Sequence, residues 1–131
     1  MAVDINEEYT NIKNLLGQLK RAERISFPES GYPCADNGRG VYVIRDSDGK
    51  VLHVGRTPRA AHGLNQRLRD HLRGSSSFVR GHFEGDGNQL RHGCTFQFLV
   101  VNDERKRALL ESLAIGTLCP QHLGLHQIVE G

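Results

Sequence analysis

Two side chains that can take up and release protons lie on either side of a predicted turn. Tyr42 and His53 belong to two apolar runs that the polar loop 46–49 separates. If this loop closes a two-residue hairpin, Tyr42 and His53 face each other across two antiparallel strands. A phenol beside an imidazole can orient or deprotonate a water molecule. A bulge at Gly49 would shift this register, and the alternative for Tyr42 is a half-buried strand tyrosine without chemistry.

A guanidinium and a second imidazole share one edge of a predicted helix. Arg67 and His71 are four residues apart, and both border the apolar stripe of Leu64, Leu68 and Leu72. An arginine held at the border of the core can place a fixed positive charge where a phosphate accumulates negative charge. The alternative for Arg67 is an ordinary surface ion pair with a nearby acid.

Glu111 lies among apolar residues of the last predicted helix, next to Leu110 and Leu113. A carboxylate in such surroundings is costly to desolvate unless it is paired or bound to a cation. Mg²⁺ suits the position, because it often takes only one or two protein carboxylates and fills its shell with water and substrate phosphate. The alternative is a salt bridge to Arg107 or to an arginine of the preceding helix.

Arginines are concentrated between residues 56 and 80. Six of them stand against one acid, Asp70, so this stretch carries a net charge of +5, whereas the whole chain carries +2. The planar arginine fork grips two oxygens of one phosphate, which suits contacts to a nucleic-acid backbone. The arginines predicted to make such contacts are Arg56, Arg59, Arg69, Arg73 and Arg80. A merely solvated helix face is the alternative.

Hydrophobic spacing predicts the elements that position these residues. Three segments repeat apolar residues at helical intervals: 6–24, 64–73 and 103 to about 115. Three others are typical of strands: 40–45, 50–55 and 94–101. Asp103 is a suitable cap for the last helix, and the segment 26–39, with its prolines and glycines, is expected to be irregular.

This order of elements indicates an α/β (α+β) fold, in which helices flank a small antiparallel sheet and an additional helix precedes it. We divide the chain into an N-terminal helix with its approach segment, residues 1–39, and the domain that carries the chemistry, residues 40–131. The N-terminal helix is expected to pack on that domain, with a dimer or partner contact as the alternative.

Length and composition limit the class of protein further. The longest apolar runs have four residues, far short of the roughly 20 that a membrane helix needs. The beginning of the sequence lacks the order of a secretion signal, so we expect a cytoplasmic protein without a membrane partner. The three cysteines are widely spaced and form no C-x-x-C pair, so we expect reduced and mostly buried thiols.

Taken in order, these residues resemble the signature of the GIY-YIG nuclease superfamily. Its pieces are Gly40-Val41-Tyr42, His53-Val54-Gly55, Leu64-x-x-Arg67-x-x-x-His71 and Leu110-Glu111, within residues 40 to 120. Each piece is common by itself, so the order and the spacing carry the resemblance. The resemblance implies a three-stranded antiparallel sheet flanked by helices. It also implies metal-dependent hydrolysis of a nucleic-acid phosphodiester, usually in DNA.

The resemblance also implies site residues, position by position. Tyr42 stands at the tyrosine of the first motif and His53 at the tyrosine of the second. Arg67 stands at the helix arginine, His71 at the histidine that often follows one turn later, and Glu111 at the metal-binding carboxylate.

The chain departs from the family pattern at several positions. His53 replaces a tyrosine, and an imidazole titrates near neutrality, so cleavage could survive with a different pH profile. Leu123 stands where many members have an asparagine, and the longer connection 56–66 could touch substrate. His82 or His92 could replace another polar residue of the family.

We therefore predict a DNA endonuclease in which Glu111 holds one Mg²⁺ or Mn²⁺ ion. Neighbouring cations would pull the phenol pKa of Tyr42 below its usual value of about 10, so that Tyr42 orients or deprotonates the attacking water. Arg67 would stabilise the transition state, while His53 and His71 relay the proton or hold Tyr42 in place.

Two other functions are compatible with the same residues. The first is a nucleic-acid-binding module of the same fold in which the changes at His53 and Leu123 have weakened cleavage. The second is an interaction domain whose N-terminal helix binds a partner. DNA is the expected substrate and RNA the alternative, and neither base specificity nor oligomeric state follows from the sequence.

Overall fold

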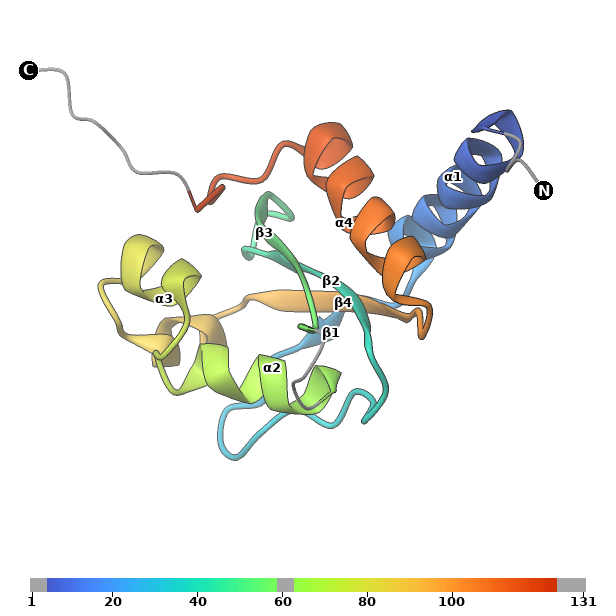
Figure 1. Cartoon of the computed structure of the whole chain (residues 1–131). Coiled ribbons are helices and arrows are strands. Elements are labelled where there is room, and N and C mark those ends of the chain that lie inside the picture. Colours follow the sequence, from blue (N-terminus) through green and yellow to red (C-terminus); the bar gives the residue numbers. More distant parts are fainter. Residues whose placement is uncertain (1–4, 59–62, 125–131) are drawn as a thin grey trace, which may run out of the picture.

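A computed structural model of the chain describes residues 5–58 and 63–124 (Figure 1). Its helices are α1 (Ile5–Arg21), α2 (Leu64–Leu72), α3 (Ser77–His82) and α4 (Glu104–Leu118), with a short 3₁₀ helix η1 (Gly87–Arg91). Its strands are β1 (Ile25–Ser26), β2 (Gly40–Arg45), β3 (Val51–Arg56) and β4 (Thr95–Val100). The strands form one antiparallel sheet in the order β1-β4-β2-β3. The predicted fold class is confirmed, and β1 adds a short strand to the three that were expected.

Helices cover both faces of this sheet, with α1 and α4 on one side and α2 and α3 on the other (Figure 1). Successive side chains of β2 point to opposite faces. Val41 and Val43 therefore enter the apolar core beneath α1 and α4. Tyr42 and Ile44 enter the second core, beneath α2 and α3. This alternation places the phenol of Tyr42 on the α2 side.

The β2–β3 hairpin has a different register from the predicted one. Tyr42 pairs with Gly55, and His53 pairs with Ile44, so the predicted direct opposition of Tyr42 and His53 is wrong. The register shifts at a bulge between Ile44 and Arg45. Because the side-chain period of a strand is two, a displacement of two residues keeps His53 on the same face as Tyr42.

The turn explains one residue of this displacement, and the bulge between Ile44 and Arg45 explains the other. The Asp46 amide donates to the Lys50 carbonyl (2.9 Å), so three residues, rather than two, lie between the paired positions. Gly49 has a φ of +85°, a left-handed conformation that glycine adopts without steric cost. The Asp46 carboxylate accepts the Asp48 and Lys50 amides at 2.9 Å each, which fixes this longer loop.

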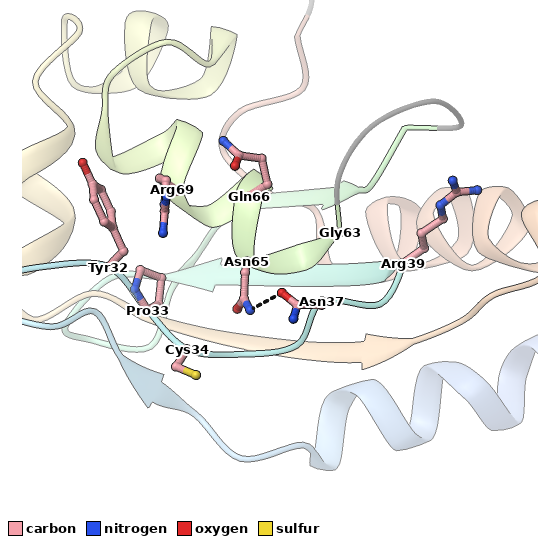
Figure 2. A pocket seen from close by; sticks show the side chains of 9 residues that line it. All are labelled: Tyr32, Pro33, Cys34, Asn37, Arg39, Gly63, Asn65, Gln66 and Arg69. Carbon is pink, nitrogen blue, oxygen red and sulfur yellow. Dashed lines mark hydrogen bonds between the residues drawn. The ribbon is translucent and has the colours of Figure 1, made fainter.

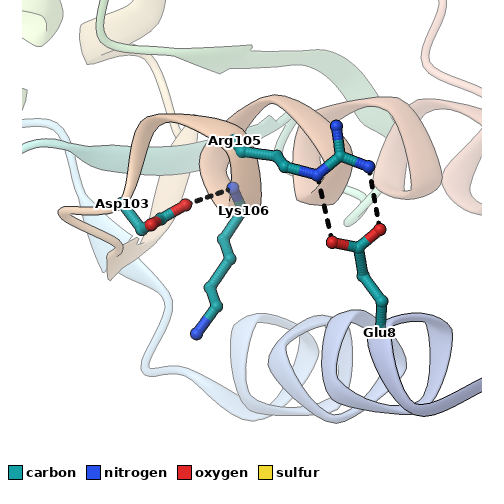
Figure 3. A network of polar contacts seen from close by, with 4 residues as sticks. All are labelled: Glu8, Asp103, Arg105 and Lys106. Atoms are coloured by element: carbon teal, nitrogen blue, oxygen red, sulfur yellow. Dashed lines mark hydrogen bonds and ion pairs between the residues drawn. The ribbon is translucent and has the colours of Figure 1, made fainter. Parts of the chain in front are cut away.

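Helix α1 packs against α4, as expected for the N-terminal helix. Ile12, Leu16 and Leu19 are buried in the core that α1 shares with α4. On the surface, Arg105 of α4 donates two hydrogen bonds, of 2.9 and 3.0 Å, to the Glu8 carboxylate of α1 (Figure 3). A bidentate pair of this kind also fixes the relative orientation of the two helices.

The start of α4 confirms the predicted cap, because the Asp103 carboxylate accepts the Lys106 amide at 2.8 Å (Figure 3). The expectation of mostly buried thiols is wrong: Cys94 is buried, but Cys34 and Cys119 are exposed. Both lie in segments outside the sheet. Within the described residues, no helix is long and apolar enough to cross a membrane.

Candidate active site

The phenol of Tyr42 is completely buried and lies between two side chains of α2. The Arg67 Nε donates to the Tyr42 hydroxyl at 3.2 Å, and the His71 Nε2 lies 2.7 Å from the same oxygen. Arg67 and His71 project from one edge of α2, as their spacing of four residues predicts. Three residues selected from the sequence therefore meet at one oxygen atom.

The hydrogen bonds continue from His71 to Ser76. The His71 Nδ1 lies 2.7 Å from the Ser76 hydroxyl, which also accepts the Val79 amide at the start of α3. Burial holds the pKa of His71 well below 6.5, so the ring is neutral and carries one hydrogen. With that hydrogen on Nδ1, Ser76 accepts it and Nε2 accepts the Tyr42 hydroxyl hydrogen. The chain from Tyr42 to Ser76 is then satisfied, and His71 is ready to receive the phenol proton.

His53 completes an aromatic cluster beside Tyr42. Its ring stacks on Phe78, with centroids 4.6 Å apart and planes 5° apart, and its centroid lies 5.8 Å from that of Tyr42. Burial, with help from His122 and Arg67, lowers the pKa of His53 to about 3. The sequence suggested an imidazole that titrates near neutrality, but the folded protein keeps this ring neutral. Its Nε2 is buried without a hydrogen-bond partner among the described residues.

Gly55 leaves the space that Tyr42 and His53 need. A Cβ at this position would lie 3.0 Å from the His53 Nε2 and closer still to the Tyr42 hydroxyl. Both polar atoms therefore point to the space above Gly55, where only a residue without a side chain fits. Position 55 is thus a glycine because the phenol lies against its backbone.

Replacing Gly55 by alanine is therefore expected to displace the Tyr42 ring. The added methyl group overpacks a buried site, and such changes cost about 1–3 kcal/mol of unfolding free energy. Urea denaturation should show this loss. Any cleavage activity should also fall under conditions in which the variant is still folded. A matched variant, Gly116→Ala on the exposed part of α4, has open space around its Cβ. It should leave cleavage unchanged and should not lower stability, since alanine is favoured over glycine in a helix. An unaltered Gly55→Ala protein would contradict the packing described here.

Glu111 of α4 is half-buried, and its Oε1 lies 3.4 Å from the Arg56 guanidinium at the end of β3. Burial raises the pKa of Glu111, while Arg56 and Arg67 act in the opposite direction. The salt bridge considered as an alternative, to Arg107, is not formed: Arg107 is buried and donates to the Val101 and Asn102 carbonyls. The partner of Glu111 is instead one of the arginines assigned to nucleic-acid binding.

Electrostatic effects connect Glu111 with Tyr42. The pKa of Tyr42 is raised to about 12, mainly by burial and in small part by the Glu111 charge, although Arg67 lowers it. The predicted fall of this pKa below 10 is therefore wrong, because the desolvation of a completely buried phenol outweighs one guanidinium. Tyr42, Arg67 and Glu111 nevertheless lie close enough to influence one another.

The remaining arginines lie away from this cluster. Arg69 stacks on the ring of Tyr32, with 4.4 Å between the guanidinium carbon and the ring centroid, and Arg73 donates to the Tyr32 hydroxyl at 3.4 Å. Arg80 is exposed on α3. Arg59 lies outside the described residues.

A hollow of about 670 Å³ adjoins this stack on the outer side of α2 (Figure 2). Its polar walls come from Arg39 and Arg69 and from the side-chain amides of Asn37, Asn65 and Gln66. Asn65 donates to Asn37 at 2.9 Å, which connects α2 to the segment before β2 (Figure 2). Cations and amides dominate this surface, which suits an anionic ligand such as a phosphate backbone.

A divalent cation on Glu111 would have one carboxylate from the protein, and water would supply most of its other ligands. Within the described residues, no group of three or more histidine, cysteine, aspartate or glutamate side chains could hold a metal. A half-buried carboxylate with a raised pKa gains from a cation, and Mg²⁺ or Mn²⁺ accepts one carboxylate with water and phosphate as further ligands. Glu111 would be the residue that holds it.

Sequence reasoning missed two polar residues of the site. Ser76 was not among the candidates, although its position three residues before Val79 is typical of a helix cap. His122 was not among them either, yet its Nδ1 lies 3.3 Å from the Nδ1 of His53. The resemblance had pointed to this segment, but through its neighbour Leu123, which is exposed.

The neutral histidines make the stability of the fold depend on pH. The folded pKa of His53 and that of His71 lie below the unfolded value of about 6.5, so the unfolded chain binds more protons in mild acid. The free energy of unfolding should therefore fall below about pH 6.5, by up to about 1.4 kcal/mol per pH unit for each histidine.

Urea denaturation between about pH 7 and pH 5.5 measures this loss. His71→Gln should reduce the pH dependence, whereas His92→Asn, at an exposed histidine, should not. An equal pH dependence in all three proteins would contradict the buried neutral state.

Comparisons with known proteins identify similar sequences and a similar fold. No model of a known protein family matches the chain. Over 85 residues, or 65% of its length, the chain is 34% identical to UvrABC system protein C of Brucella abortus (strain 2308). It is 32% identical over 85 residues to the protein of the same name from Chelativorans sp. (strain BNC1). The aligned region spans only 12% of each of these longer relatives.

Among solved structures, the chain is similar to the GIY-YIG N-terminal endonuclease domain of UvrC from Thermotoga maritima, crystallised as a point mutant bound to its catalytic divalent cation. The similarity has a TM-score of 0.52 at 22% sequence identity, and it covers 70% of this chain and 89% of that one. At this identity the similarity establishes the fold, and the chemistry has to be argued from the residues.

Proposed function

We propose that this chain, whose fold is that of the GIY-YIG domain, is a divalent-metal-dependent endonuclease that hydrolyses phosphodiester bonds in DNA. The observation that carries the proposal is the position of the Tyr42 hydroxyl, 3.2 Å from the Arg67 Nε and 2.7 Å from the His71 Nε2. A phenol, a guanidinium and an imidazole at one point form a site for water activation next to a phosphate. Glu111, which acts electrostatically on Tyr42, supplies the carboxylate.

The buried phenol acts on the attacking water in this proposal. The Tyr42 oxygen accepts a proton from the water while its own hydrogen passes to the His71 Nε2, and the Nδ1 of that ring continues to donate to Ser76. With the pKa of Tyr42 raised and that of His71 lowered by burial, both groups are neutral before the substrate binds. The proton transfer therefore belongs to the transition state, when negative charge on the phosphate favours an imidazolium.

Arg67 stabilises that negative charge. Its Nε is occupied by Tyr42, so its terminal amino groups are the part that would bind phosphate oxygens. The fork fixes the phosphate relative to the phenol, which is positioning as well as charge stabilisation. The water that Tyr42 activates then attacks phosphorus, and the bond to the leaving sugar oxygen breaks.

Glu111 is the proposed ligand of Mg²⁺ or Mn²⁺. When bound, such an ion would polarise a phosphate oxygen and stabilise the leaving oxygen. The Arg56 guanidinium lies 3.4 Å from the Glu111 carboxylate, so a bound cation would compete with Arg56 for this carboxylate. We propose that Arg56 turns to the DNA backbone when the metal and the substrate are both present.

The hollow beside α2 is proposed to bind the DNA backbone outside the scissile position. Replacing both Arg39 and Arg69 by alanine should therefore weaken binding and lower the salt dependence of the association constant. Each lost phosphate contact reduces the slope of log K against log salt by about 0.9 for duplex DNA, so we expect a reduction of about 2.

Fluorescence anisotropy at several salt concentrations measures this slope. A control variant with the same change in net charge, Arg21→Ala with Lys106→Ala on the α1 and α4 surface, should keep the slope of the wild type. Equal slopes in all three proteins would mean that the hollow does not contact the backbone.

Incubation of supercoiled plasmid with the protein and Mg²⁺ or Mn²⁺ tests the proposed activity. We expect nicking that EDTA abolishes. Binding to the plasmid without nicking would favour the second function, a binding module that has lost cleavage. If the protein neither binds nor nicks the plasmid at low salt, both functions are contradicted.

A further inference from the structure

The segment after α4 returns to the active site and runs beside β3. The Gln121 amide donates to the Val51 carbonyl at 3.2 Å, and the His122 amide donates to the Leu52 carbonyl at 2.9 Å. These bonds place the His122 ring against His53, with centroids 5.3 Å apart, and against Phe78, with centroids 5.6 Å apart. The backbone thus fixes a histidine next to the residue that replaces the tyrosine of the second motif.

The two imidazoles share one hydrogen. The Nδ1 atoms of His53 and His122 are 3.3 Å apart, and a hydrogen bond between two neutral rings requires a hydrogen on one of them and a lone pair on the other. Both rings favour the neutral form, because burial lowers the pKa of each. The tautomer of one ring therefore determines the tautomer of the other.

The other nitrogen of His53 lies on the same side of Gly55 as the Tyr42 hydroxyl. Its Nε2 is buried without a partner among the described residues, next to the space above Gly55 at which Tyr42 also points. An unsatisfied buried polar atom costs free energy and calls for an explanation. The phosphodiester of the proposed substrate would present only acceptor oxygens to the His53 Nε2. This nitrogen must therefore carry a hydrogen in order to bind it.

We propose that His122 is a positioning residue that holds His53 in the Nε2–H tautomer. The Nδ1–H of His122 donates to the Nδ1 of His53, and the Nε2–H of His53 then donates to a phosphate oxygen of the substrate. His53 in this tautomer offers the single donor that a tyrosine hydroxyl would offer at the same place. The choice of this tautomer and the identity of the acceptor both rest on the proposed nuclease function, whereas the hydrogen bond between the two rings does not.

Direct observation of the tautomers tests the proposal first. Long-range ¹⁵N–¹H correlation spectra of the ¹⁵N-labelled full chain near pH 7.5 distinguish a protonated from a bare ring nitrogen. We expect a hydrogen on the Nε2 of His53 and on the Nδ1 of His122. His122→Phe should shift His53 towards the Nδ1–H tautomer, whereas His92→Asn should not. A wild-type His53 with a hydrogen on Nδ1 would overturn the proposal, whether or not the protein cleaves DNA.

Cleavage rates test the functional part. His122→Phe should slow plasmid nicking by about tenfold, in the range known for residues that orient an active group through a hydrogen bond. In a His53→Tyr background the hydroxyl needs no partner to select a tautomer, so the same change at His122 should have no effect. Equal losses in both backgrounds would overturn the positioning role. Absence of nicking in every protein would contradict the proposed function and leave the tautomer measurement to decide the inference.

Discussion

Replacing Glu111 by glutamine is expected to abolish metal-dependent cleavage without unfolding the protein. Glutamine keeps the size and shape of the side chain but lacks the charge that would hold Mg²⁺ or Mn²⁺. Metal ions stabilise transition-state charge by several kcal/mol, so the nicking rate should fall by about a thousandfold or more. The stability should change little, since the carboxylate is half-buried and its ion pair with Arg56 is partly exposed.

Plasmid nicking at saturating Mg²⁺ measures this loss. Glu23→Gln, at an exposed glutamate between α1 and β1, is the matched control and should cleave like the wild type. A Glu111→Gln protein that cleaves within a few-fold of the wild-type rate would show that this carboxylate does not hold the metal.

Replacing Tyr42 by phenylalanine should have the second largest effect. The ring volume and the packing under α2 are kept, but the oxygen between Arg67 and His71 is lost. General acid–base groups contribute about a hundredfold to ten-thousandfold to a rate, so we expect cleavage to slow by at least about a hundredfold. Binding of DNA should be nearly unchanged, because the phenol is completely buried and Tyr42 does not line the hollow that contains Arg39 and Arg69.

Single-turnover cleavage and anisotropy, measured on the same protein, separate these two effects. Tyr9→Phe, at an exposed tyrosine of α1, is the control and should alter neither. Loss of stability is the competing explanation, because the change leaves the His71 Nε2 without a hydrogen to accept. A slow Tyr42→Phe protein with unchanged urea denaturation supports the chemical role, and a fast one contradicts it.

Most of the fold could be predicted from the sequence because its elements carry strong local patterns. The apolar stripe of α2, the apolar run of β2 and the cap Asp103 are each determined by residues close together in the chain. The two-residue strand β1 could not be predicted, since its pairing with β4 joins positions about 70 residues apart and its own sequence has no strand pattern. The hairpin register failed for a related reason: the bulge at Arg45 depends on the turn geometry rather than on side-chain alternation.

The candidate site was predicted well where it depended on spacing and poorly where it depended on burial. The helical interval between Arg67 and His71 was enough to place both on one edge, and the structure brings them to Tyr42. The direction of the Tyr42 pKa shift could not be read from neighbouring cations, because complete burial outweighs them. Nor could the sequence show that Arg56 would pair with Glu111, or that Arg69 and Arg73 would bind Tyr32, since these contacts are made by segments distant in the chain.

The histidines show the same limit. His122 is 69 residues from His53, and no local pattern marks it as a neighbour of the active site. Its proposed role depends on the backbone bonds that hold the last described segment along β3. The contact between His53 and His122 is thus visible only in the fold.

The position of a bound Mn²⁺ ion tests the central claim most directly, namely that Tyr42, Arg67 and Glu111 converge on one cation-dependent site. A crystal of the wild-type protein soaked in Mn²⁺ would show the ion by its anomalous scattering. We predict one ion on the Glu111 carboxylate, on the side that faces Tyr42 and Arg67, and no ion there in Glu111→Gln. An ion bound on another face of the molecule, with Glu111 still paired to Arg56 alone, would contradict it.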